Sequence, residues 1–209
     1  LEFIFTFLNI QNIKKEIETM NKSYKLLTNI GFTKYFITEA ILSNQIENYI
    51  IPVNINYIKR ELAYYGEEFS NIYGEFSSTS TNFFSKNYNN YIENKNVTIF
   101  TISNQNETKE TQPYSTAMNR IPTTVFYVST ISDETLTLNM SERNCYELMK
   151  NLLNGYFNTL KEVTFILVDD TVQSSKNSIV STLLFIGSFI INTIFLIIIW
   201  KILNNFLED

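Results

Sequence analysis

Histidine is absent from this 209-residue chain, and cysteine occurs once, at position 145. Without histidine there is no Ser-His-Asp or Cys-His relay, no histidine-bearing zinc or di-iron site, and no imidazole pH switch. One cysteine excludes an intrachain disulfide framework and a cysteine-rich metal cluster. The acidic pairs Glu67-Glu68 and Asp169-Asp170 are adjacent in sequence, so on a helix their side chains diverge. We therefore expect no enzymatic activity, no catalytic residue, no cofactor and no metal.

Clustered positive charge is also missing. The chain carries a formal charge of -5 with a pI near 4.9, and its 16 lysine and arginine residues form no basic block. Binding to a nucleic-acid backbone needs clustered lysine and arginine. The sequence therefore excludes nucleic acid as a partner.

One long apolar run is present near the C-terminus. No residue between Lys176 and Lys201 is charged, and residues 179–200 (IVSTLLFIGSFIINTIFLIIIW) are apolar almost throughout. As a helix this run spans roughly 33 Å, enough to cross a hydrocarbon core of about 30 Å. Trp200 lies at its boundary, and Lys176 and Lys201 bracket it as interfacial anchors. The sequence predicts a transmembrane helix with the lipid bilayer as its partner.

Small and polar residues gather on one face of this span. Ser181, Ser188 and Asn192 are spaced by seven and four residues, and Gly187 lies beside them. Such side chains allow close helix approach and hydrogen bonds between helices in a membrane. One interpretation is packing against other transmembrane helices, from the same parent protein or from a homo-oligomer. The other is a single lipid-facing span that tolerates a few polar groups.

The first ten residues form a second, shorter apolar stretch. Leu1, Phe3, Ile4, Phe5 and Phe7 belong to it, and so do Leu8 and Ile10. Ten residues are too few to span a bilayer. Because the stretch is apolar on every face, we interpret it as the end of an upstream transmembrane helix, with the first turns of a packed soluble helix as the alternative.

Between these two ends, apolar residues recur at helical spacing in four segments. The first segment has a seven-residue repeat typical of coiled coils, and it runs until Pro52. Its expected solvent-exposed side carries Lys14, Lys15, Glu16, Glu18 and Lys22. The four stripes are Ile10, Ile13, Ile17, Met20, Tyr24 and Leu27, resuming at Ile37 and Ile41; Ile58, Leu62, Tyr65, Phe69, Ile72 and Phe76; Tyr114, Met118, Ile121, Val125 and Val128; and Tyr146, Met149, Leu153, Tyr156, Leu160, Val163 and Leu167.

The third segment is ambiguous, because residues 123–130 would also suit a strand; we predict a helix over about 113–131, bent at Pro122. Residues 97–102 alternate like a short strand, but the surrounding residues from about 77 to 112 lack periodicity and are predicted to be a long loop. Ser141 is the expected cap of the fourth helix.

Four amphipathic helices of about 41, 20, 19 and 32 residues can bury their stripes only against one another. The predicted fold is therefore all-α: an antiparallel up-down four-helix bundle whose last helix continues into the transmembrane helix. The predicted organisation is residues 1–10 as the end of an upstream transmembrane helix, 11–176 as the bundle, 177–203 as the transmembrane helix, and 204–209 as a tail.

Several segments resemble a known family. These are NKSYKLL (residues 21–27), PYSTAMNRI (113–121) and SERNCYELMKNLLNGYFNTLKEVTFILVDD (141–170). The pattern is similar to the extracytoplasmic module of large multi-pass membrane proteins of ciliates that carry PAS domains, the tiny macrocysts protein-like family. The resemblance implies a helical ectodomain between two transmembrane helices in a protein with an inferred sensing or signalling role. It supplies no catalytic residue.

Four glycosylation sequons, at Asn21, Asn96, Asn106 and Asn139, are compatible with an extracellular or luminal bundle. Asn96 and Asn106, in the predicted loop, are the better acceptors. The positive-inside rule leaves the orientation of the span open. We expect a membrane-anchored, non-enzymatic, receptor-like sensor module with an unknown ligand. The alternatives are a structural membrane scaffold or subunit that positions protein partners, and a tail-anchored fusion protein of the SNARE type.

Overall fold

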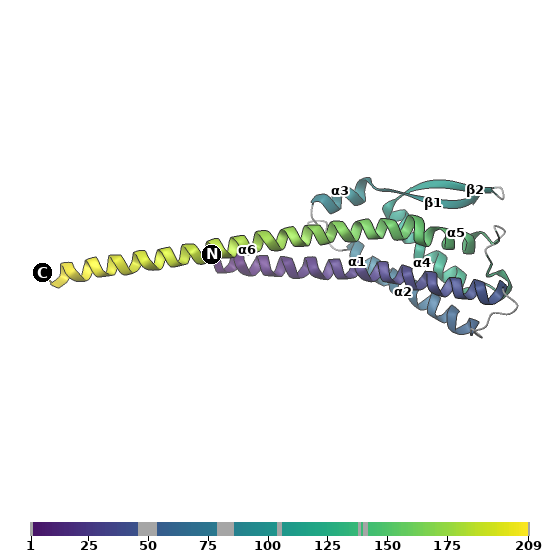
Figure 1. Cartoon of the computed structure of the whole chain (residues 1–209), viewed down its shortest axis with the longest axis horizontal. Coiled ribbons are helices and arrows are strands. Elements are labelled where there is room, and N and C mark those ends of the chain that lie inside the picture. Colours follow the sequence, from purple (N-terminus) through teal and green to yellow (C-terminus); the bar gives the residue numbers. More distant parts are fainter. Residues whose placement is uncertain are drawn as a thin grey trace.

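The computed structural model of the chain describes residues 2–45, 54–78, 86–103, 106–137, 139 and 142–208, and it is mostly helical with a small two-stranded sheet (Figure 1). The long helices are α1 (Glu2–Gln45), α2 (Ile55–Ser78), α4 (Tyr114–Thr130) and α6 (Phe157–Glu208). The shorter elements are α3 (Lys86–Asn94), β1 (Asn96–Ser103), β2 (Asn106–Pro113), η2 (Asp133–Thr135), α5 (Arg143–Asn151) and η3 (Leu152–Tyr156).

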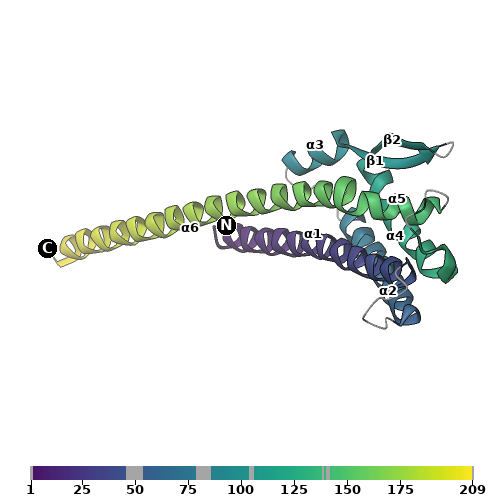
Figure 2. The same ribbon diagram turned by 45° about the vertical axis from the view of Figure 1, so that its right-hand side comes forward.

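Helices α1 and α6 lie side by side and run in opposite directions (Figures 1 and 2). The hydroxyls of Ser23 and Thr164 share a hydrogen bond of 2.8 Å between them. Near the other end of α1, the Thr38 hydroxyl lies 4.0 Å from the sulfur of Met149, which belongs to α5, the helix before α6. The N-terminus of α1 therefore reaches the middle of α6, and the C-terminal part of α6 extends beyond it alone.

The core of the helical part is built where α2 packs on α1 and α4 packs on α2. Phe32 of α1 stacks on Tyr65 of α2 with ring centroids 5.1 Å apart. A methyl group added at Gly66 of α2 would lie 3.1 Å from a Val125 methyl group, so these helices approach closely. The predicted helix at 113–131 is confirmed as α4, with Pro122 inside it, and all five residues of its predicted stripe are buried.

The predicted all-α fold and the long loop at 77–112 are wrong in one region. Residues 86–94 form α3, and β1 and β2 form an antiparallel hairpin in which Asn96 is opposite Pro113 and Ser103 is opposite Asn106. β1 buries Val97, Ile99 and Thr101, as the alternation at 97–102 suggested, and it also buries Ile102, which breaks the alternation. β2 is exposed except at Gln112. β2 is polar along its length and shows no hydrophobic alternation. For that reason its composition alone indicated a loop.

The first half of the fourth stripe is displaced by one residue. The buried residues are Cys145, Leu148 and Leu152, where the sequence predicted Tyr146, Met149 and Leu153. The later positions, Tyr156, Leu160, Val163 and Leu167, are buried as predicted. The shift arises at η3, which is a turn of π-helix, because the wider π turn accommodates one more residue than an α turn. Ser141, the predicted cap, lies outside the described residues.

The stripe predicted for the first helix is also wrong in part. Ile17 and Tyr24 are 41% and 63% exposed, while Ser23, Leu26, Asn29, Ile30 and Thr33 are buried, as are Ile37, Ala40 and Ile41. The buried face thus continues without a gap between Leu26 and Ile37, where the predicted stripe had an interruption. Hydrophobicity missed this face because several of its positions are small polar residues, which permit close approach to α6.

The hairpin lies directly on the junction between α5 and α6, and one glycine makes this contact. A Cβ atom added at Gly155 would lie 2.8 Å from the carbonyl oxygen of Thr98 in β1, a distance at which the backbone must move. We expect Gly155→Ala to destabilise the protein by about 1–3 kcal/mol. Thermal unfolding followed by circular dichroism in a non-ionic detergent measures this loss.

Gly74→Ala is the matched control, because a Cβ atom at Gly74 of α2 meets nothing within 4 Å. Alanine in a helix interior is favoured over glycine by about 1 kcal/mol, so this variant should be at least as stable as the parent. Equal stability of the two variants would show that β1 does not touch the junction.

Candidate membrane helix and its connection to the helical domain

Among the described residues, one helix is long and apolar enough to cross a membrane, and it ends in the span predicted from the sequence. α6 runs into this span without a break, as predicted, and every side chain from Ser188 to Trp200 is exposed. Burying apolar surface is worth about 25 cal/mol per Å2, so a face of this size is unfavourable in water. These properties indicate membrane association through the C-terminal part of α6.

The predicted anchors flank the apolar run of residues 179–200. Lys176 and Lys201 are both exposed, and Trp200 is 68% exposed. Amphipathic aromatic rings and long lysine side chains are favoured at membrane interfaces. The arrangement fits the anchoring role predicted for the three residues, which remains a prediction.

The start of α1 lies beside the first half of the apolar span. Because the helices are antiparallel, the Ser23–Thr164 contact places Phe7 and Leu8 about level with Ile179 and Val180. Phe7 and Leu8 are each 53% exposed. An apolar segment of α1 and an apolar segment of α6 therefore occupy the same level. The side chains of residues 1–6 and 9 lie outside the described part of the chain.

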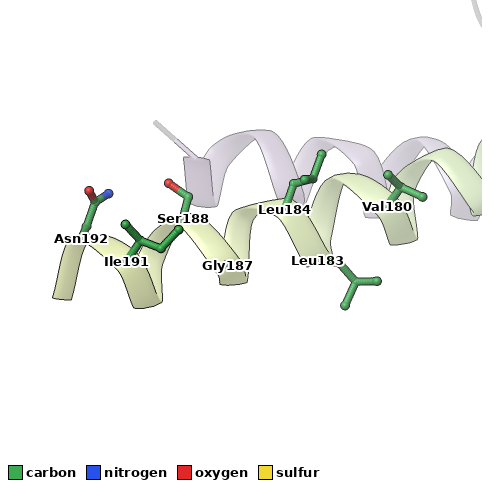
Figure 3. Close-up of a pocket in the computed structure, with 7 residues that line it drawn as sticks. All are labelled: Val180, Leu183, Leu184, Gly187, Ser188, Ile191 and Asn192. Carbon is green, nitrogen blue, oxygen red and sulfur yellow. The ribbon is translucent and has the colours of Figure 1, made fainter. Parts of the chain in front are cut away.

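A shallow hollow of about 500 Å3 follows the face of α6 on which Ser188 and Asn192 lie. Gly187, Ser188 and Asn192 line it, whereas Ser181 does not. Figure 3 shows Leu184, Ser188 and Asn192 projecting from the same side of α6, with Asn192 past the first turn of α1. The predicted role of these residues in helix packing remains a prediction.

At the opposite end of the molecule, Glu147 of α5 holds the hairpin and α4 together. Its carboxylate accepts hydrogen bonds from the Ile102 backbone N–H at 3.0 Å and from Arg143 Nε at 2.7 Å. Arg120 of α4 donates to its other oxygen at 2.5 Å. The Glu147 side chain is only 4% exposed, so these interactions are largely shielded from water.

Asn151, one turn further along α5, binds the backbone of β1 as a neighbouring strand would. Its side-chain oxygen accepts from the Phe100 N–H, and its amide nitrogen donates to the Phe100 carbonyl, both at 2.7 Å. Sequence reasoning missed Glu147 and Asn151. The signal in the sequence was the spacing of Glu147 and Asn151 by four residues, which places both polar side chains on one face of the helix.

Glu16 is half-buried between α1 and α6, although the sequence predicted that it would lie on the solvent-exposed side of the helix. Burial raises the pKa of this carboxyl, a hydrogen bond from Ser174 opposes the shift, and the charge of Asp170 adds to it. The α1–α6 contact near the span is therefore more stable when Glu16 is protonated, and this gain is lost as the pH rises through the pKa of the folded state.

The other sequence-derived candidates lie on the helical part. All four sequon residues are exposed: Asn21 on α1, Asn96 and Asn106 at the starts of β1 and β2, and Asn139 after η2. Asn96 and Asn106 thus lie in the hairpin and not in a loop. Cys145 is buried, and burial raises the pKa of its thiol to about 11. In the described part of the chain, no group of three or more potential metal-ligating side chains occurs.

The chain thus belongs to a broad class: a mostly helical protein with one candidate membrane-spanning helix. Comparison with protein-family models, with curated proteins and with solved structures finds no match. The resemblance to the ciliate membrane proteins accordingly stays an expectation.

Proposed function

We propose that this protein is a membrane-anchored, non-enzymatic, receptor-like module that couples a helical domain to a transmembrane helix. The observation that carries the proposal is the continuity of α6, a single helix from Phe157 to Glu208. Its first part packs on α1, and its last part is the apolar span. A helix transmits a displacement of about 1–2 Å along its axis because its backbone hydrogen bonds keep it stiff.

The arrangement at the two ends supports this role. At the far end, Glu147 and Asn151 tie the hairpin to α5, so a ligand-induced movement of the hairpin would displace the start of α6. We further propose that the four long helices act as one antiparallel bundle, and that residues 1–10 belong to a second membrane helix antiparallel to α6. The second point is supported by the position of residues 2–10 of α1, which lie at the level of the apolar span.

The bundle is proposed to lie on the extracellular or luminal side of the membrane. Support comes from the exposed sequons at Asn96 and Asn106 and from the resemblance to an extracytoplasmic module. Glycosidase treatment of the protein made in a eukaryotic host tests this point. A mobility shift that disappears on replacing Asn96 or Asn106 by glutamine supports it, and an unglycosylated product with both sequons intact argues for the opposite side.

Labelling of single cysteines in intact vesicles tests the membrane helix. The parent chain serves as the background, because the buried thiol of Cys145, with its raised pKa, should react slowly with maleimides. We expect Leu153→Cys and Val172→Cys, in the helical domain, to be modified by a maleimide added on the accessible side. Phe189→Cys and Phe195→Cys should react only after detergent is added. Equal modification of all four variants in intact vesicles would contradict the proposal.

The same labelling separates a sensor from the alternative scaffold. Asn151→Ala removes the contact between α5 and β1 and leaves the apolar span unchanged. For a coupled module we expect the labelling rate of Val172→Cys to change in this background. An unchanged rate, with the hairpin shown to be released by faster amide exchange of Phe100, would favour a structural role.

A further inference from the structure

An aromatic groove of about 690 Å3 lies on the face of the helical domain between α1, α2 and the start of α6. Its rings are Tyr24, Phe32, Tyr35 and Phe36 from α1 and Tyr57 and Tyr65 from α2. Tyr24, Phe32, Tyr35 and Tyr57 are between 44% and 63% exposed. Exposed aromatic rings that are gathered in one groove, and not scattered singly, are typical of a binding surface.

The rings are held in fixed orientations by one another. Tyr65 stacks with both Phe32 and Phe36, with centroid separations of 5.1 Å and 5.7 Å. Phe36 in turn meets Tyr57 edge to face at 6.2 Å. Gly31 leaves the space above α1 open, because a Cβ atom there would meet nothing within 4 Å. The groove is therefore preformed, and a ligand would lose little binding energy in ordering it.

One carboxylate lies among these rings. Glu61 lines the groove one turn from both Tyr57 and Tyr65, and its side chain is 22% exposed. Among the described residues, its nearest cationic partner is the Arg60 guanidinium at 3.8 Å, which is beyond hydrogen-bond distance. Arg60 itself lies over the ring of Tyr57, 5.4 Å from its centroid, so a ring of this groove already accepts a cation.

From this geometry we propose that the groove binds a small organic cation, of the quaternary ammonium or substituted amine class. Aromatic faces attract a cation with an apolar surface, and a partly desolvated carboxylate supplies the complementary charge. Phe157, the first residue of α6, completes the lining. The ligand would therefore contact both helices of the pair that leads to the membrane. The signalling consequence of this site rests on the proposed function, whereas the binding itself does not.

Choline chloride is the probe, and its neutral isostere 3,3-dimethylbutan-1-ol is the control ligand. Binding is measured by isothermal titration calorimetry on the full chain in dodecyl maltoside, a detergent without a cationic headgroup. We expect choline to bind at least about tenfold more tightly than the neutral isostere, because the two differ in charge and scarcely in shape. Equal affinities, or no binding of choline at millimolar concentration, would overturn the proposal.

Three variants locate the site. Glu61→Gln keeps the shape of the side chain and should weaken choline binding about tenfold, whereas Glu67→Gln makes the same charge change on the other side of α2 and should leave binding unchanged. Gly31→Leu should fill the groove and abolish binding with the helix content retained. If both glutamine variants weaken choline binding equally, choline is attracted by the overall negative charge of the protein. That result would overturn the proposed site. If the chain forms a dimer that Gly31→Leu dissociates, the groove is a contact between two copies of the chain. That result would also overturn the proposed site.

A last measurement separates this inference from the proposed function. Choline binding that changes the labelling rate of Val172→Cys supports both the site and the coupling. Binding with the expected charge dependence but with no change in labelling supports the site and argues against the sensor role.

Discussion

Two arginines placed in the apolar span should release the protein from the membrane. Ile190→Arg and Ile194→Arg lie four residues apart on α6, and both side chains are exposed, at 53% and 51%. An arginine at the centre of a membrane helix costs about 2.5–3.5 kcal/mol of insertion free energy, so the pair costs about 5–7 kcal/mol. The double variant should move from the carbonate-resistant membrane pellet to the soluble or aggregated fraction.

The matched control places two arginines at the same spacing on the same helix, outside the span. Phe165→Arg and Asp169→Arg are four residues apart and exposed. This variant should remain in the membrane pellet with the parent protein. If carbonate washing extracts the parent chain as readily as the span variant, the C-terminal part of α6 is not in lipid, and the proposed membrane coupling fails with it.

Removing the Glu147 carboxylate should cause the largest loss of stability within the helical domain. Glu147→Ala leaves the Arg120 guanidinium, 27% exposed, and the Ile102 N–H without their shared acceptor. Breaking a buried ion pair from one side costs about 3–5 kcal/mol when the remaining charge has no other partner. Glu110, whose carboxylate lies 3.9 Å from Arg120, should offset part of this loss. Glu147→Gln retains an acceptor for Ile102 and should lose less.

Amide hydrogen exchange measures this loss where it occurs. The amides of Phe100 and Ile102 should exchange about 100- to 1000-fold faster in Glu147→Ala than in the parent, since each 1.4 kcal/mol corresponds to a factor of ten. Glu134→Ala, an exposed glutamate of η2, serves as control and should change stability by less than about 0.5 kcal/mol. Unchanged exchange at Ile102 in Glu147→Ala would show that the carboxylate does not hold β1.

The elements that were predicted correctly are those with a strong local pattern. The apolar run after Lys176 was recognisable because transfer to lipid depends on composition, which sequence displays directly. The α4 stripe was recognisable because each of its positions is large and apolar. The β2 strand escaped detection because its pairing with β1 uses backbone groups, which every sequence has.

The candidate sites also differ in how far the sequence could predict them. The anchors and the polar face of the span followed from spacing on one helix, whereas the aromatic groove brings together α1, α2 and Phe157, which are distant in sequence. Tyrosine and phenylalanine are frequent throughout the chain, so no single ring marked the groove beforehand. The carboxylate of Glu61 became a candidate binding group only once the structure placed aromatic rings around it.

The sequence alone determined where apolar residues recur at helical spacing, because hydrophobic periodicity is a property of neighbouring residues. That was enough to define the long helices and the apolar span. The tertiary structure alone decided which face of α1 is buried, where the π turn shifts the register before α6, and how Glu147 and Asn151 attach the hairpin. These features depend on close packing and on hydrogen bonds between segments far apart in the chain, and no local pattern records such contacts.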